Sequence, residues 1–186
     1  MIFVAEGAST FNEQLLSRYL LNNARNDEER AFLINRQLDA MRATIFRQTM
    51  FAEFEKLAHH STESGEPLTL DRFKEIYRGL LEQYFGPDFA IDDELSLECL
   101  RIPHFYRAFY VYKYATGMSA AVALADRVTG GGQAELNDYL SFLKGGCSKD
   151  PLDLLRDAGV DMEKPAAVDG ALEQFGMLVE ELDGLL

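Results

Sequence analysis

Two carboxylates near the start of the chain are the first residues whose spacing could support chemistry. Glu6 and Glu13 lie seven residues apart in an otherwise apolar segment, with Ser9 between them. At ~100° per residue, positions i, i+3 and i+7 share one face of a helix, so these three side chains are expected to point the same way. A carboxylate that turned inward would need a metal, a cation or hydrogen-bond donors to offset its lost hydration. From spacing alone, the alternative is a solvated acidic stripe on an amphipathic helix.

A second group of polar side chains follows Pro103, where a histidine and four tyrosines occur between positions 104 and 114. Pro103 suits the first turn of a helix, which would place the side chain of His104 near an open helix end. On one continuous helix Tyr112 would lie about 80° around the axis from His104 and two turns further along. The pair is therefore expected to border one cleft. The alternative is a buried aromatic helix whose hydroxyl groups bond to backbone partners.

Both segments resemble the oligoendopeptidase F family of zinc peptidases, relatives of thimet oligopeptidase. The first reads FVAEGASTFNE over 3–13, and the second reads PHFYRAFYVYKYAT over 103–116. A third stretch, YLSFLKGGC over 139–147 with PLDLL and AGVDM after it, is similar to the C-terminal signature of the family. The resemblance spans essentially the whole chain.

The resemblance implies a role for each of these polar residues. Glu6 matches the third zinc ligand, while the other two ligands and the general base belong to an HExxH helix that the 186 residues do not contain. Glu13 and Ser9 would then lie around the ligand, with Glu13 accepting a hydrogen bond that keeps Glu6 aligned. His104 matches the histidine that, with a tyrosine hydroxyl, stabilises the oxyanion formed during peptide hydrolysis. The first choice for that tyrosine is Tyr112, and the second is Tyr106.

On this resemblance the chain is expected to be the C-terminal part of a zinc metalloendopeptidase, a hydrolase of short oligopeptides. Zn²⁺ would be bound in the intact enzyme, and the isolated chain would be inactive because it holds one zinc ligand. One alternative is a non-catalytic helical binding module that docks, or forms a homo-oligomer, through exposed apolar surface. Another is one half of a split peptidase that assembles with a separate N-terminal half.

Composition excludes several classes of partner. The net charge of −13, from 31 acidic and 18 basic residues, argues against nucleic acid and against an anionic membrane surface. No apolar run reaches the ~18–20 residues that span a bilayer. The two cysteines, Cys99 and Cys147, suggest no disulfide framework and fit a reducing cytosol. A cytoplasmic location is therefore expected.

The elements that must position these residues are predicted to be helices throughout. Hydrophobic residues make up 47% of the chain, and valine and threonine never form alternating runs, so we expect a single all-α, bundle-like domain over residues 1–186. Asp27 is the expected N-cap of the second helix, and His59-His60 its expected end. Apolar periodicity predicts helices over about 3–22, 27–58, 70–84, 104–128, 134–143, 151–158 and 168–182.

Overall fold

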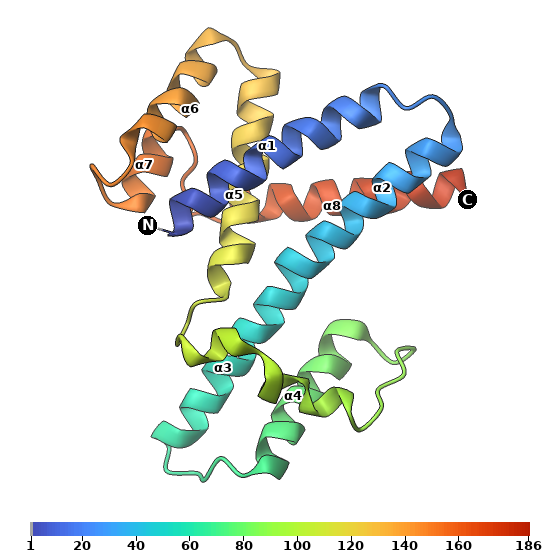
Figure 1. Ribbon diagram of the computed structural model, residues 1–186, viewed down its shortest axis with the longest axis vertical. Coiled ribbons are helices and arrows are strands. Elements are labelled where there is room, and N and C mark those ends of the chain that lie inside the picture. Colours follow the sequence, from blue (N-terminus) through green and yellow to red (C-terminus); the bar gives the residue numbers. More distant parts are fainter. Residues whose placement is uncertain (1) are drawn as a thin grey trace. The chain divides into compact units, whose positions relative to one another are not determined.

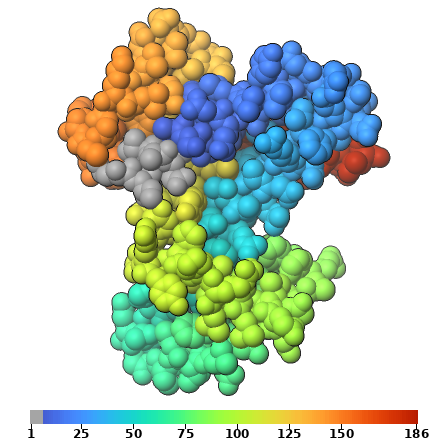
Figure 2. All heavy atoms as spheres, in the orientation of Figure 1, coloured from blue at the N-terminus to red at the C-terminus, as the bar shows by residue number. Residues whose placement is uncertain are grey.

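The computed structural model describes the backbone of residues 2–186 and the side chains of residues 7–186, which form two compact units (Figure 1). The first unit contains the chain up to Ile45 and residues 113–186, and the second unit contains residues 46–112. Figure 2 shows the packed side chains of both units in the same order of colours. The described residues are mostly helical and include no strand, which confirms the all-α class. The expectation of a single domain over 1–186 stays a prediction.

Six helices account for most of the described part of the first unit. They are α1 (Ile2–Asn22), α2 (Asp27–Met41), α5 (Tyr112–Gly130, of which Tyr112 belongs to the second unit), α6 (Gln133–Gly145), α7 (Pro151–Asp157) and α8 (Ala166–Leu185). The second unit contains α3 (Arg47–Glu63), α4 (Leu70–Phe85) and the 3₁₀ helices η2 (Leu95–Arg101) and η3 (Pro103–Tyr106). A π-helical segment, η1 (Arg42–Phe46), contains the point at which the chain leaves the first unit.

The core of the first unit explains why α1 lies where it does. Phe11 of α1 is 2% exposed, and its ring stacks on that of Tyr139 in α6 with centroids 3.8 Å apart. The facing stretch of α5 is rich in small buried residues such as Ala121 and Ala125, which allow close approach between helices. Full burial of an aromatic side chain of this kind contributes about 1.5–3 kcal/mol. This contact anchors the helix that carries Glu6.

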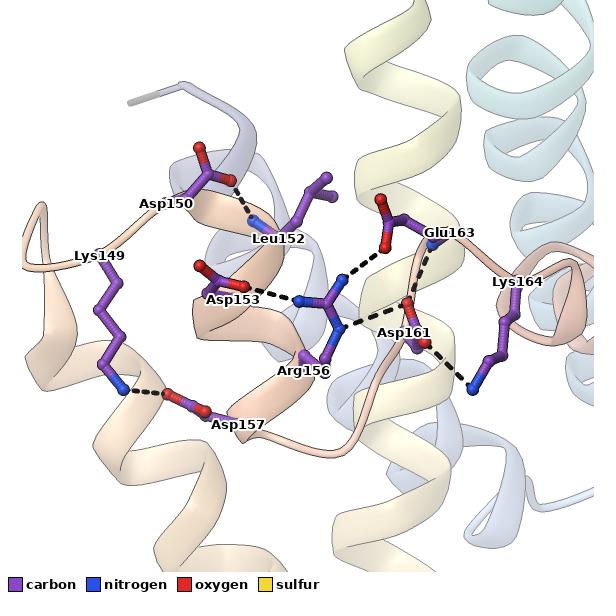
Figure 3. A network of polar contacts seen from close by, with 9 residues as sticks. All are labelled: Lys149, Asp150, Leu152, Asp153, Arg156, Asp157, Asp161, Glu163 and Lys164. Carbon is purple, nitrogen blue, oxygen red and sulfur yellow. Dashed lines mark hydrogen bonds and ion pairs between the residues drawn. The ribbon is translucent and has the colours of Figure 1, made fainter.

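A network of charged side chains holds the loop that follows α7. Arg156 in α7 bonds to Asp153 at 2.6 Å and to Glu163 at 2.7 Å, and it pairs with Asp161 at 3.7 Å (Figure 3). Lys164 pairs with Asp161 from the other side at 3.2 Å. These pairs are largely exposed and screened by solvent, so each contributes little to stability. Their effect is to fix the path of the loop rather than to stabilise the unit strongly.

One buried carboxylate, that of Glu98, links several elements within the second unit. Glu98 of η2 is 6% exposed and accepts a hydrogen bond from the hydroxyl of Tyr77 in α4 at 2.6 Å. Arg47 at the start of α3 and Arg101 at the end of η2 also pair with Glu98. Burial, together with the Glu98 carboxylate, raises the pKa of the Tyr77 hydroxyl, which therefore stays a donor. Glu98 thus ties α3, α4 and η2 together.

Both ends of the predicted second helix, 27–58, differ from the structure. The N-cap of α2 is Asn26, not Asp27, because Asn26 is extended and its side chain accepts the N–H of Glu29 at 2.8 Å. At its other end, helical structure continues past His59-His60, because α3 ends only at Glu63. Ser61 is buried there and donates to Glu66 at 2.8 Å, so the last turn of α3 is held by a contact that periodicity does not reveal.

A glycine after α7 is required by its surroundings. Gly159 has φ +84°, a left-handed conformation that side chains disfavour. A Cβ placed on Gly159 would lie 2.3 Å from Cζ of Arg127. That guanidinium group bonds to Asp138 in α6 at 3.3 Å, so it cannot move away without losing a contact.

We predict that Gly159→Ala lowers the free energy of unfolding by roughly 1–3 kcal/mol, because it combines left-handed strain with this clash. Gly176→Ala is the matched control, since Gly176 is exposed in α8 and a Cβ there meets open space. The control should be neutral or stabilising by up to ~1 kcal/mol. Urea denaturation followed by circular dichroism measures both; an equal response of the two variants would contradict the prediction.

Candidate functional site

The first group of candidate residues lies on α1, in the first unit. Ser9 and Glu13 are exposed, on the side of the helix away from the buried Phe11. The side chain of Glu6 lies outside the described residues, so its role as a ligand stays a prediction. Beside Glu13 the first unit has a hollow of about 200 Å³ that Arg36 and Gln37 of α2 also line. The face that Glu6 is expected to share is therefore a surface of the first unit.

The second group lies in the second unit, but not on one helix. The predicted helix over 104–128 is wrong at its start, because His104 belongs to the short helix η3 and α5 begins only at Tyr112. The angle of 80° between His104 and Tyr112 therefore does not describe their geometry. Between them Phe109 adopts φ +54°, a left-handed conformation that is uncommon for a bulky residue.

A buried carboxylate explains this break. Glu55 in α3 is 4% exposed, and its Oε1 accepts the backbone N–H of Phe109 at 2.9 Å. In a continuous helix that N–H would donate to the carbonyl of residue 105 instead. The ring of His59, one turn further along α3, packs against the ring of Phe109 with centroids 4.7 Å apart. Two residues of α3 thus hold the turn between His104 and Tyr112.

The three candidate hydrogen-bond donors of the second unit are at its surface. His104 is exposed, Tyr106 is 89% exposed and Tyr112 is 45% exposed. The ring of His104 lies near that of Tyr110, with centroids 5.8 Å apart, so the histidine has an aromatic neighbour on the same segment. Exposed donors of this kind can contact a molecule bound outside the unit. Sequence reasoning missed Glu55, whose only signal was an acidic residue at an otherwise apolar helix position.

The electrostatics of Glu55 follow from its burial. Loss of hydration raises the pKa of this carboxyl above its ordinary value, while the N–H of Phe109 and the nearby His59 oppose that rise. The second oxygen, Oε2, is buried and accepts no hydrogen bond from any described residue. Glu55 therefore combines a fixed backbone contact with an unsatisfied acceptor.

No metal site is complete within the described part of the chain. Among the side chains of residues 7–186, no three histidine, cysteine or acidic groups lie close enough to hold an ion. His59 and His60 lie next to one another on α3, but they line two different hollows. The donor set of these residues does not by itself fit zinc, which takes three or four protein ligands. None of the described helices is both long and apolar enough to span a membrane.

Comparison with known proteins decides the family. The family described as Peptidase family M3 matches residues 1–174. The chain belongs to peptidase family M3. It is 48% identical over 185 residues to the oligopeptidase PepF of Bacillus subtilis, and 44% identical over 181 residues to an oligoendopeptidase F homolog of Borreliella burgdorferi. These matches cover 100% and 97% of this chain but 28% and 31% of the relatives, so the chain spans less than a third of their length.

Solved structures agree with this assignment. The crystal structure of oligoendopeptidase-F from Enterococcus faecium matches with a TM-score of 0.95 and 42% identity, covering 100% of this chain and 36% of that one. A structure of a putative peptidase from Chlamydophila abortus matches with a TM-score of 0.92 and 39% identity, over 100% of this chain and 31% of that one. The resemblance to oligoendopeptidase F is thus confirmed, as is the helical fold expected for an M3 peptidase.

The raised pKa of Glu55 predicts a pH effect on stability. Between the ordinary glutamate pKa, about 4.3, and the raised pKa of Glu55, the folded chain keeps a proton that the unfolded chain has lost. This contribution to the free energy of unfolding is therefore present at low pH and is lost as pH rises through the folded pKa. Relative to Glu55→Gln, which cannot titrate, the wild-type chain should lose stability as pH rises above the ordinary glutamate pKa and through the raised pKa of Glu55.

Urea denaturation at several pH values measures this difference. Glu63→Gln is the matched control, because it removes the same charge from an exposed position of the same helix. A wild-type stability that rises with pH relative to Glu55→Gln would show that the carboxylate is stabilised, not destabilised, by its site.

Proposed function

We propose that this chain supplies part of the active site of a zinc metalloendopeptidase that hydrolyses short oligopeptides. The observation that supports this most is the match to peptidase family M3 over residues 1–174, with 48% identity to a bacterial oligopeptidase. We further propose that residues 1–186 act as one functional domain of such an enzyme. Proteolysis of short peptides in the cytoplasm is the activity that follows.

In this proposal Glu6 is one of three zinc ligands. The other two are the histidines of an HExxH helix, a motif that is absent from the 186 residues. A zinc ion held by these three ligands would supply a Lewis acid for the scissile carbonyl and for the attacking water. Glu13 and Ser9, exposed on α1, are suited to keep Glu6 oriented by hydrogen bonding once further polypeptide covers this face.

His104 and a tyrosine donate hydrogen bonds to the negative charge that develops on the carbonyl oxygen. Tyr112 is the first choice, because it begins α5 directly after the turn that Glu55 and His59 hold. Tyr106 is the second choice, on the same short helix as His104. Fixed donors of this type lower the barrier because they are already oriented when the charge appears.

A second candidate function is a helical interaction module, alone or as one half of a split peptidase. Leu16 and Tyr19 on α1 and Phe32 on α2 are 54%, 65% and 66% exposed, and exposed apolar side chains favour association. Sedimentation equilibrium of the 186-residue chain separates the options. A self-associating chain supports a homo-oligomer, and a monomer at all concentrations counts against it.

The isolated chain should not cleave peptides. One carboxylate with water does not make a tight zinc site, so incubation with a quenched fluorescent peptide and excess Zn²⁺ should give no turnover above buffer. Sustained cleavage that a chelator abolishes would defeat this prediction.

The chain should support catalysis when it replaces the matching segment of the B. subtilis relative. In that chimera Glu6→Gln should reduce zinc retention, measured by metal analysis of the dialysed protein, while the exposed Glu28→Gln is the control.

In the same chimera His104→Ala and Tyr112→Phe should each lower kcat by roughly 10²–10³-fold with a smaller change in KM. Tyr19→Phe, on an exposed tyrosine of α1, should leave kcat unchanged. An active chimera that tolerates the change at His104 would contradict the proposed role.

A further inference from the structure

A pocket of about 390 Å³ opens in the second unit between α3, α4, η2 and η3. Its volume is typical of small-ligand sites, and its walls are mostly apolar. Phe54 of α3, Phe73 of α4 and Phe105 of η3 supply three aromatic rings, and the rings of Phe54 and Phe105 lie 5.3 Å apart. Thr62 and Tyr106 are exposed lining residues. All of these residues lie in one compact unit, so the pocket is a property of that unit.

The apolar wall contains one carboxylate. Glu55 lines the pocket, and its Oε2 is buried without a hydrogen-bond partner among the described residues. Its other oxygen is already used by the N–H of Phe109 at 2.9 Å. An unsatisfied carboxylate oxygen is destabilising relative to a paired one, and a ligand that brings a donor to it would remove that penalty. The pocket thus favours a ligand with a donor head on an apolar stem.

The carboxylate and the aromatic rings of this lining, which also includes His59, favour a cation over a neutral donor. A guanidinium or ammonium group pairs with a carboxylate more strongly than a neutral amide does, and aromatic faces within about 6 Å attract cations as well. Phe105 and Tyr106 follow His104 directly on η3, so the pocket adjoins the residue proposed to contact the scissile carbonyl. We propose that this pocket binds the side chain of an arginine or lysine residue of a peptide, an inference that rests on the proposed peptidase function.

Other occupants fit less well. A purely apolar side chain would fill the aromatic part of the pocket but would leave Oε2 of Glu55 unpaired. An acidic side chain would place two carboxyl groups together in a mostly apolar site, which costs free energy. A basic side chain satisfies the carboxylate with its head and the phenylalanine rings with its methylene stem.

Direct binding to the 186-residue chain tests the proposal without zinc and without cleavage. The probe is N-acetyl-Ala-Arg-Ala-amide, and the matched peptide carries citrulline, an uncharged isostere of arginine. Titrations are followed by ¹H–¹⁵N NMR at one fixed pH for both peptides and all variants. We expect the arginine peptide to bind at least tenfold more tightly than the citrulline peptide, with shifts at residues that line the pocket.

Three variants locate the binding site. Glu55→Gln keeps an oxygen acceptor for Phe109 but removes the charge, and it should reduce the preference for arginine to less than threefold. Glu63→Gln removes one charge from an exposed position of the same helix and should keep the preference. Thr62→Lys, at an exposed position that lines the pocket, should weaken arginine binding without unfolding the unit.

The outcomes are distinct from those that test catalysis. Equal binding of both peptides, no detectable binding of the arginine peptide, or a preference that survives both Glu55→Gln and Thr62→Lys would each overturn the proposal. An inactive chimera combined with charge-selective binding would sink the proposed peptidase function and leave the binding site standing.

Discussion

The geometry of the second unit depends on one hydrogen bond, in which a buried carboxylate accepts a backbone N–H. Glu55 accepts a hydrogen bond from the backbone N–H of Phe109. The segment after His104 therefore cannot continue as a regular helix, and α5 starts only at Tyr112. The contact is part-buried, and Glu55 itself is only 4% exposed, so breaking it would leave the buried carboxylate without its backbone donor. The left-handed Phe109 is the local cost of this arrangement. The positions of His104 and Tyr112 are therefore set by this hydrogen bond and the turn at Phe109 rather than by helix periodicity.

The same carboxylate links architecture to recognition. One oxygen of Glu55 holds the turn, the other is buried without a partner, and the residue lines an aromatic pocket that Phe105 also lines. Burial raises the pKa of this group, so its charge is costly unless a partner is present. A basic side chain in the pocket would therefore stabilise the ionised form that the empty pocket disfavours. Glu55 therefore both holds the turn before α5 and is the residue on which the proposed specificity depends.

Each unit has its own means of fixing its helices. In the first unit the stacked rings of Phe11 and Tyr139 hold α1, and the charged pairs around Arg156 fix the loop after α7. In the second unit Glu98 joins three elements through Tyr77 and two arginines. The family assignment agrees with the helical fold, and the chain covers less than a third of its curated relatives. The zinc chemistry expected of the whole enzyme therefore remains a proposal for this part of it.

The sequence by itself determined the helical class, most helix positions and the family, because apolar periodicity and long motifs are local properties. α1, α4 and α8 lie close to their predicted ranges for that reason. The tertiary structure alone decided that His104 and Tyr112 are on separate helices, because the competing acceptor, Glu55, lies 54 residues from Phe109. It also decided where the pocket lies, since its walls come from four elements that only folding brings together. Contacts between residues far apart in sequence leave no periodic signal, and that is why the pattern missed them.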